Sequence, residues 1–297
     1  MILVFGTMCL DRVRFIPNFP KPGGYVEVTD DRILLGGEAA NTANALKSWG
    51  AEVRLEGNRL GNSPNGDLIR SLLEERGILP TVDAHDTGDA PVCDLFITPD
   101  GERTMIGIGF SATDGSIDVS RIDYPEGEWF TAEPNMSRTS REAVQRAYAA
   151  GMCLYLMDFS RPDEQIPESS ICQHGTDWVG ERNNPRANLR WASEWSKKHD
   201  CTTILTDGPN GFAVSDPNGQ ANWHDALVEP GLVAVDSTGA GDLFRAGTLY
   251  GLDQGWPLER AILYGAAAGA LICRSIGATV NVPTIAEIES LIAEKRA

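Results

Sequence analysis

The fold is decided by one segment, Val233-Ala234-Val235-Asp236-Ser237-Thr238-Gly239-Ala240-Gly241-Asp242-Leu243-Phe244-Arg245-Ala246-Gly247. A short apolar stretch runs into small residues and then into a stretch whose apolar positions fit one face of a helix, namely Leu243, Phe244, Leu249 and Leu252. The pattern predicts a strand over 232–235 and a helix over 240–252. A strand that leads through glycines into a helix is the repeating unit of α/β proteins with a parallel sheet.

The turn between this strand and this helix has the chemistry of an anion-binding site. Glycine lets the backbone approach a ligand closely, and the first turn of a helix leaves amide N–H groups without intrahelical partners. The amides of Gly239, Ala240 and Gly241 are therefore predicted to form an anion hole for a phosphoryl group. Asp242 lies in the same turn, so its carboxylate is predicted to face the ligand. The alternative is that Asp242 only caps the helix and that the glycines only make a tight turn.

Strand and helix patterns alternate along most of the chain. Besides the apolar start at 2–6, strands are predicted at 52–57, 153–158, 202–206, 211–215 and 232–235. Helices are predicted at 38–49, 64–76, 139–150, 187–199, 240–252, 257–274 and 284–295. This alternation predicts a Rossmann-like, three-layer α/β/α fold, in which ligands bind beyond the carboxyl ends of the strands. No repeat or long linker interrupts it, so one domain is expected over 1–297.

Two regions depart from this pattern. Residues 12–35 and 91–110 alternate apolar and polar side chains and contain turn residues, such as Gly23-Gly24 and Pro99-Asp100-Gly101-Glu102. Both are predicted to form antiparallel strands, and together they predict a small sheet, or lid, outside the main domain. Apolar residues could line one face of this lid and pair two copies of the chain as a homodimer: Val13, Phe15, Val26, Val28, Leu95, Ile97, Met105 and Ile108.

Composition excludes several classes of function. A formal net charge of −17 over 297 residues repels nucleic-acid phosphates and anionic lipid surfaces. The chain has no uninterrupted run of about 18 apolar residues, and no basic residues precede its apolar start. Its six cysteines and four histidines are scattered, without the spacing of a zinc site. A cytoplasmic protein that binds neither nucleic acid nor membrane is expected.

Two segments resemble the signatures of one known family. The run Asp236–Phe244 resembles the D-T-x-G-A-G-D-x-F signature of the ribokinase-like (PfkB) carbohydrate kinases. The run Gly36-Gly37-Glu38-Ala39-Ala40-Asn41-Thr42-Ala43 resembles the N-terminal G-G-x-x-x-N-x-A segment of the same family. Weaker similarities at Asp11, 101–104, 206–211 and 277–278 extend the resemblance over nearly the whole chain.

The resemblance implies an activity and a set of site residues. Such enzymes transfer the γ-phosphoryl group of ATP, with Mg²⁺, to a hydroxyl of a sugar or sugar-like acceptor, and Asp242 would be the general base. The acceptor would contact Asp11, Gly36, Gly37, Asn41 and Glu133. The nucleotide would lie near Thr206, Gly208 and Gly211, beside the helix at 257–274. Asp236 would help to hold a monovalent cation such as K⁺.

One motif of the family is absent. An N-x-x-E sequence, associated with Mg²⁺ and phosphate, is expected after the strand that precedes the T-x-G strand, but residues 177–185 lack it. Asn183 or Asn184 is the expected replacement, with Glu181 displaced. Three alternatives stay open: a nucleoside kinase of the same family, a non-catalytic sugar-binding member, and a nucleotide-cofactor oxidoreductase. The last is disfavoured because no G-x-G-x-x-G follows the first strand. Neither the acceptor nor the hydroxyl that is phosphorylated follows from the sequence.

Overall fold

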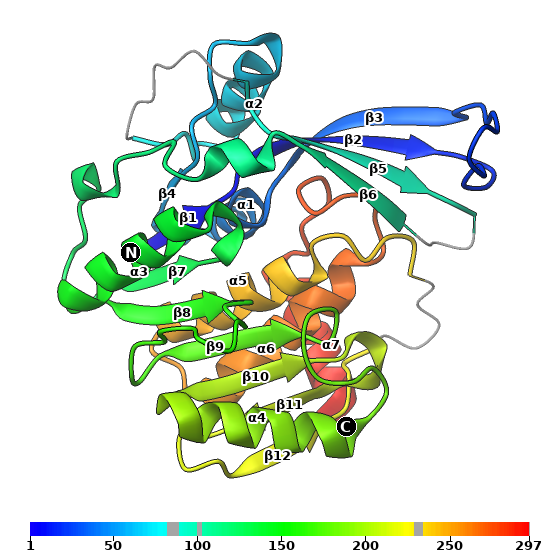
Figure 1. Ribbon diagram of the computed structural model, residues 1–297. Coiled ribbons are helices and arrows are strands. Elements are labelled where there is room, and N and C mark those ends of the chain that lie inside the picture. Colours follow the sequence, from blue (N-terminus) through cyan, green and yellow to red (C-terminus); the bar gives the residue numbers. More distant parts are fainter. Residues whose placement is uncertain (82–88, 100–102, 229–233, 297) are drawn as a thin grey trace.

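The computed structural model describes residues 1–81, 89–99, 103–228 and 234–296 (Figure 1). Its main sheet has eight strands in the order β12-β11-β10-β9-β8-β7-β1-β4. The strands are β1 (Ile2–Gly6), β4 (Val53–Gly57), β7 (Trp129–Ala132), β8 (Cys153–Met157), β9 (Ile171–Gly175), β10 (Thr202–Thr206), β11 (Phe212–Ser215) and β12 (Ala221–His224). Neighbouring strands from β4 to β10 are parallel, and β11 and β12 add antiparallel pairs at one edge.

Helices cover both faces of this sheet. Strand β1 is buried throughout, and its side chains alternate between two cores, as expected for a strand covered on both sides. Ile2 and Val4 belong to a core with α1 (Glu38–Ser48), α5 (Ala240–Asp253), α6 (Leu258–Ile272) and α7 (Ile285–Arg296). Leu3 and Phe5 belong to the opposite core, with α3 (Arg138–Ala149) and α4 (Pro185–His199). The predicted three-layer α/β/α fold is therefore confirmed (Figure 1).

Close packing of α5 on α6 fixes the helix that carries Asp242. A Cβ added to Gly247 would lie 2.8 Å from the Cα of Gly265. A Cβ on Gly265 would lie 2.3 Å from Oγ1 of Thr248. No side chain fits between the helices at these points, so the glycines let the two backbones approach directly. The position of α5 is set by this contact and by its contact with α1.

A second sheet of four strands, in the order β3-β2-β5-β6, projects beyond the carboxyl ends of the main strands (Figure 1). Its strands are β2 (Cys9–Phe15), β3 (Asp30–Gly36), β5 (Val92–Ile97) and β6 (Arg103–Ile108). The outer pairs are antiparallel, and β2 and β5 are parallel at the centre. The predicted lid is therefore confirmed. In the sequence, α2 (Pro64–Glu75) lies between the strand pair β2 and β3 and the strand pair β5 and β6.

The strand register corrects the predicted apolar face of the lid. Val13 lies opposite Leu95, and Leu95 lies opposite Met105, so the three side chains point to one side of the lid. Ile108, three positions after Met105, points to the other side. Val26 and Val28 lie outside the strands altogether. The expected set of eight residues therefore does not form a single face.

The element predictions were otherwise close. Each predicted helix is present, with bounds that differ by at most two residues. Strands β7, β9 and β12 were not among the predicted strands. Residues 232–233 of the predicted strand 232–235 lie outside the described residues, as do 100–102 of the predicted lid turn, and residues 234–235 are not in a strand. No helix within the described ranges is long and apolar enough to cross a membrane.

Candidate active site

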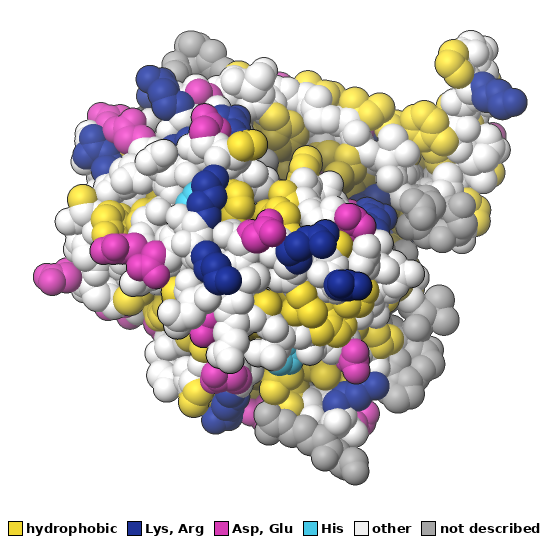
Figure 2. All heavy atoms as spheres, turned by 60° about the horizontal axis from the view of Figure 1, so that its bottom comes forward, with side chains coloured by type: hydrophobic (Ala, Val, Ile, Leu, Met, Phe, Trp, Pro, Cys, Tyr) yellow, Lys and Arg dark blue, Asp and Glu magenta, His cyan; other side chains and the backbone are white. Residues whose placement is uncertain are grey.

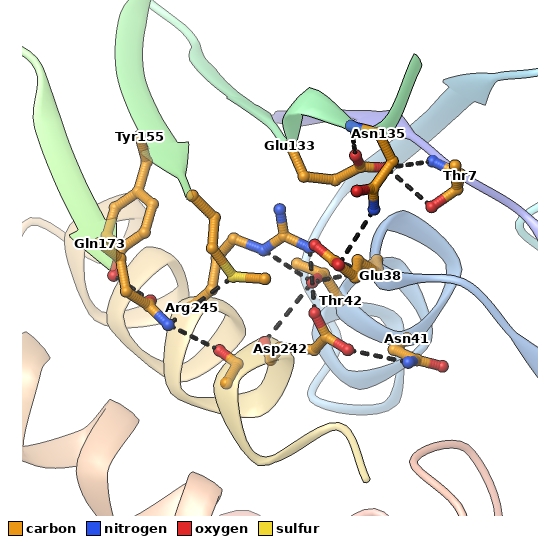
Figure 3. Close-up of polar contacts among 12 residues, drawn as sticks. Thr7, Glu38, Asn41, Thr42, Glu133, Asn135, Tyr155, Gln173, Asp242 and Arg245 are labelled. Carbon is orange, nitrogen blue, oxygen red and sulfur yellow. Dashed lines mark hydrogen bonds and ion pairs between the residues drawn. The ribbon is translucent and has the colours of Figure 1, made fainter. Parts of the chain in front are cut away.

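The two signature segments meet in space at Asp242 (Figure 3). Asp242 lies in the first turn of α5 and is buried. Its Oδ2 accepts a hydrogen bond from Nδ2 of Asn41 on α1 at 2.8 Å, across 201 positions of sequence. Its Oδ1 lies 3.3 Å from Nη2 of Arg245. A helix cap would accept from a backbone amide of its own helix, whereas these partners are side chains, so the contacts do not support the capping alternative.

The turn before α5 keeps backbone amides accessible. Gly239 has φ 79°, and an added Cβ would lie 2.1 Å from the Cβ of Ala278, so only glycine fits. Within the described residues the amides of Gly239 and Gly241 form no hydrogen bond, and both residues are partly exposed. The amide of Ala240 donates to the carbonyl oxygen of Ser237 at 3.2 Å. The predicted anion hole thus offers two free amides, and the third takes part in the turn.

The environment of Asp242 suits a proton acceptor. Burial raises the pKa of the Asp242 carboxyl to about 7; the Arg245 guanidinium lowers it, and the neighbouring carboxylates of Glu38 and Glu133 raise it. A general base works best when its pKa lies near the working pH. A carboxyl whose pKa is raised toward neutrality can both accept and return a proton.

The predicted acceptor residues gather where β2, β3 and α1 meet. A Cβ on Gly36 would lie 2.2 Å from Cγ of Asp11, and one on Gly37 would lie 2.3 Å from the carbonyl oxygen of Thr7. Burial raises the pKa of Asp11 to about 6, while a hydrogen bond from Sγ of Cys9 at 3.3 Å lowers it. Oδ1 of Asn41 is buried and has no partner in the described chain. Such an oxygen is placed to accept a hydrogen bond from a ligand hydroxyl.

Glu133 follows β7 and is fully buried. Its Oε1 accepts hydrogen bonds from the backbone amide and, at 2.8 Å, the hydroxyl of Thr7. Its Oε2 accepts from the amide of Asn135 at 2.6 Å, which caps the short helix Pro134–Met136. Burial, followed by the charge of Glu38, raises the pKa of Glu133 to about 7. Glu133 therefore lies beside the site but is held by protein donors (Figure 3).

The predicted nucleotide residues lie at the carboxyl ends of β9 and β10. Thr206 ends β10, and Gly208 and Gly211 adopt φ of 52° and 124° in the following turn. Asp207, which the sequence did not single out, is buried there. Its Oδ1 accepts from the hydroxyl of Thr176 at 2.9 Å, and its Oδ2 accepts from the amide of Asn183 at 2.8 Å. Asp207 thus joins the loop with Asn183 to the Thr206 turn.

The region expected to carry a counterpart of the N-x-x-E motif, residues 177–185, follows β9. The strand before β10 is β9, which ends at Gly175, so Thr176 and Asp177 directly follow it. Asp177 pairs with Arg182 at the surface. No group of three or more His, Cys, Asp or Glu residues among the described residues could hold a metal ion.

Asp236 fixes the turn that contains the glycines. Its Oδ1 accepts from the amide and the hydroxyl of Thr238 at 2.9 and 2.6 Å. Its Oδ2 accepts from the amide of Gly277, after α6, at 2.9 Å. Nη1 of Arg103 on β6 donates to Oγ1 of Thr238 at 2.9 Å, which connects the lid to this turn. A monovalent cation at this place would need backbone carbonyls as well, because both carboxylate oxygens already accept hydrogen bonds.

Sequence reasoning missed two polar groups that support α5. Nε2 of Gln173 donates to the carbonyl oxygen of Gly241 at 3.0 Å, and the hydroxyl of Tyr155 donates to Oε1 of Gln173 at 2.7 Å. Gln173 lies on β9, which was not predicted as a strand. Arg245 is the second of these polar groups. Its position could have been noticed in the sequence, because it is a cation within the apolar run Leu243–Gly247. A charged residue on the buried face of a helix is rare unless it is paired.

Comparison with known proteins identifies the family and the fold. The family model described as pfkB family carbohydrate kinase matches residues 1–117 and 175–285. An uncharacterized sugar kinase of Dictyostelium discoideum is 28% identical over 98% of this chain and 97% of the relative. The ATP-dependent ribose-1-phosphate kinase of Halopiger xanaduensis is 26% identical over 99% and 98%. The solved ribokinase of Giardia lamblia superposes with a TM-score of 0.81 at 15% identity, covering 97% of this chain and 98% of that one.

The fold and the paired signature segments define a carbohydrate kinase with a β-sheet lid. The chain belongs to the pfkB family of carbohydrate kinases, and it is an ATP-dependent sugar kinase, an enzyme that transfers a phosphoryl group.

Proposed function

We propose that the protein transfers the γ-phosphoryl group of ATP to a hydroxyl of a small sugar or sugar-like acceptor, with Asp242 as the general base. The observation that carries this proposal is the contact between Asn41 and the buried Asp242 carboxylate beside the free amides of Gly239 and Gly241. A proton acceptor, a hydroxyl-binding amide and an anion hole occupy one place. Phosphoryl transfer to an alcohol needs these three elements.

The acceptor is proposed to bind under the lid. Its hydroxyls contact Asp11, Asn41 and the backbone at Gly36 and Gly37, and Glu133 completes this side of the site. Asp242 accepts the proton of the attacking hydroxyl as the new P–O bond forms. The amides of Gly239 and Gly241, and of Ala240 once its bond to Ser237 opens, stabilise the charge on the transferred group. The lid excludes water, which would otherwise compete as acceptor.

The phosphoryl donor is proposed to lie over the ends of β9 and β10. Thr206, Gly208, Gly211 and Asn183 surround its phosphates and ribose, and α6 lies beside the adenine. The name of the Halopiger relative, an ATP-dependent kinase, supports ATP as the donor. Mg²⁺ would be held chiefly by the ATP phosphates, with Asn183 or Asn184 in place of the missing N-x-x-E motif, and it would neutralise charge on the phosphates.

Three further features belong to the proposal. A K⁺ ion is held near Asp236 and the backbone before Gly277. The protein is a cytoplasmic homodimer joined through its lids. Support for the dimer comes from β6, an edge strand of the lid with exposed apolar side chains: Met105, Ile106 and Ile108 are 57%, 47% and 50% exposed. Figure 2 shows that Lys, Arg, Asp and Glu side chains are interspersed over one face of the molecule.

The activity is tested by measuring ADP release with ATP, Mg²⁺ and a panel of sugars and nucleosides. We expect saturable ADP formation with at least one sugar and no comparable rate without acceptor. A preference for nucleosides would make the protein a nucleoside kinase of the same family. ATP binding without turnover across the whole panel would instead indicate a non-catalytic sugar-binding member and contradict the proposal.

A further inference from the structure

Arg245 is a buried cation that the proposed reaction does not use. It lies one helical turn after Asp242 on α5, and none of its surface is exposed. Its Nε donates to Oγ1 of Thr42 at 2.9 Å, and its Nη2 donates to the carbonyl oxygen of Glu38 at 2.7 Å. The same Nη2 lies 3.3 Å from Oδ1 of Asp242. Arg245 thus connects the helix that carries the base to the start of the helix that carries Asn41.

The charges around Arg245 are acidic on every side. Glu38 of α1 lies beside it, and Glu133, after β7, lies beyond (Figure 3). The charge of Arg245 also acts on Asp158, after β8, and on Asp242 of its own helix. Burial raises the pKa of Asp158 well above its usual value, Glu38 raises it further, and the Arg245 guanidinium lowers it. Arg245 also lowers the pKa of Asp242. A buried charge persists only when it is paired, so the guanidinium and the carboxylates depend on one another.

The pairing of Arg245 is incomplete. Its Nη1 and the Oε2 of Glu38 are both buried without a hydrogen-bond partner in the described chain. A residue that served only to join two helices would gain nothing from a free donor next to the base. A free donor does leave the guanidinium able to follow the carboxylates when one of them gains or loses a proton.

We propose that Arg245 is a positioning residue for the general base, whose guanidinium holds the Asp242 carboxylate toward Asn41 and stabilises its charged form. This inference rests on the proposed function, because it assumes that Asp242 accepts the proton of the acceptor. Neighbouring Thr42 and the Glu38 carbonyl fix the guanidinium, and Asn41 fixes the other carboxylate oxygen, so the base is clamped between two side chains.

The test compares the pH profiles of Arg245→Met, Arg245→Lys and the wild type, with ATP and the acceptor found in the panel. Loss of an opposite charge at this distance raises the pKa of a carboxyl by about one to three pH units. For Arg245→Met we therefore expect the acidic limb of the kcat profile to move to higher pH by at least about one pH unit. On the acidic side of that limb, kcat falls about tenfold for each pH unit by which the limb has moved, and it recovers toward about pH 9. Arg245→Lys, which keeps the charge, should move the limb less.

Arg260→Met is the matched control. Arg260 is exposed near the start of α6, where its guanidinium stacks on Trp256, at the opposite end of the helix from Cys273, whose carbonyl oxygen accepts from the amide of Val235. The pH profile of kcat for Arg260→Met should superimpose on that of the wild type. If Arg245→Met, or the equally uncharged Arg245→Gln where the first variant does not fold, lowers stability but leaves the pH profile unchanged, Arg245 is only a link between helices and the inference is overturned.

A second measurement separates this inference from the proposed function. Urea unfolding of Arg245→Met, Asp242→Asn and the double variant gives the coupling between the two residues without any assay of activity. We expect coupling at pH 8 that weakens at pH 5, where Asp242 is protonated. Coupling of this kind in an inactive protein would support the Arg245 contact and count against the kinase. Additive effects at both pH values in an active enzyme would overturn the inference alone.

Discussion

Gly36→Ala is a small change whose effect can be worked out from the structure. The added Cβ would lie 2.2 Å from Cγ and Oδ1 of Asp11 and 2.3 Å from its Oδ2. Ordinary contacts begin near 3.4 Å, so the carboxylate must retreat by roughly 1 Å. Because Gly36 is outside the left-handed region, its backbone accepts alanine and the perturbation falls on Asp11.

The expected cost is that of one hydrogen bond between the acceptor and a charged group. Such a bond contributes about 1.5–3 kcal/mol, so kcat/KM for the acceptor should fall by roughly 10- to 150-fold. The loss should appear mainly in KM for the acceptor, with KM for ATP nearly unchanged. Steady-state ADP formation at varied acceptor concentration measures it, and melting temperature checks that the variant is folded.

Asp11→Ala supplies the matched comparison. It should reproduce the kinetic effect of Gly36→Ala, and the double variant should lose little more, because both changes remove the same contact. A folded Gly36→Ala enzyme with wild-type KM for the acceptor would refute the assignment of Asp11 as an acceptor ligand.

Three further predictions concern pH, ions and assembly. Folding raises the pKa of Asp242 from 3.8 and of Glu133 from 4.5, both to about 7, so these carboxyls stabilise the fold below about pH 4 and that contribution is lost as pH rises through 7. The free energy of unfolding by urea should therefore fall by up to a few kcal/mol between pH 5 and pH 8, and Asp242→Asn should flatten this decline. If a cation binds near Asp236, replacing a bulky organic cation by K⁺ at constant ionic strength should raise the rate, and an equal rate would exclude the site. Light scattering at micromolar concentration should show a dimer that Ile108→Lys on β6 dissociates; a wild-type monomer would contradict the lid interface.

The sequence predicted those parts of the fold whose pattern is local. Helix bounds followed from apolar periodicity and the lid from alternation, and the position of Asp242 followed from a glycine turn before a helix. Strand β9 escaped prediction because Gln173 and His174 interrupt its apolar run. Gln173 is buried because Gly241 and Tyr155 satisfy its amide, and His174 is buried against Trp191 and Trp195. Burial lowers the pKa of His174 to about 3, so it stays neutral.

Partners that lie far apart in the sequence were beyond prediction. Arg245 has its partners near position 40 on α1, and Asp207 has its partners on the loop after β9. Nothing in the neighbouring residues reveals such contacts, because they form only when the helices and strands pack. The predicted apolar face of the lid was wrong for a related reason. Alternation of apolar and polar residues predicts the strands, but only the register between strands decides on which side of the sheet each residue lies.

The central claim, that Asp242 is the general base of phosphoryl transfer, is tested most directly by Asp242→Asn. The amide keeps the size of the side chain and can still contact Asn41, but it cannot accept the proton. We predict that turnover falls by about two to four orders of magnitude, while ATP and acceptor affinities change little and the variant remains folded. A folded Asp242→Asn protein that forms ADP and phosphorylated acceptor at nearly the wild-type rate would contradict the account.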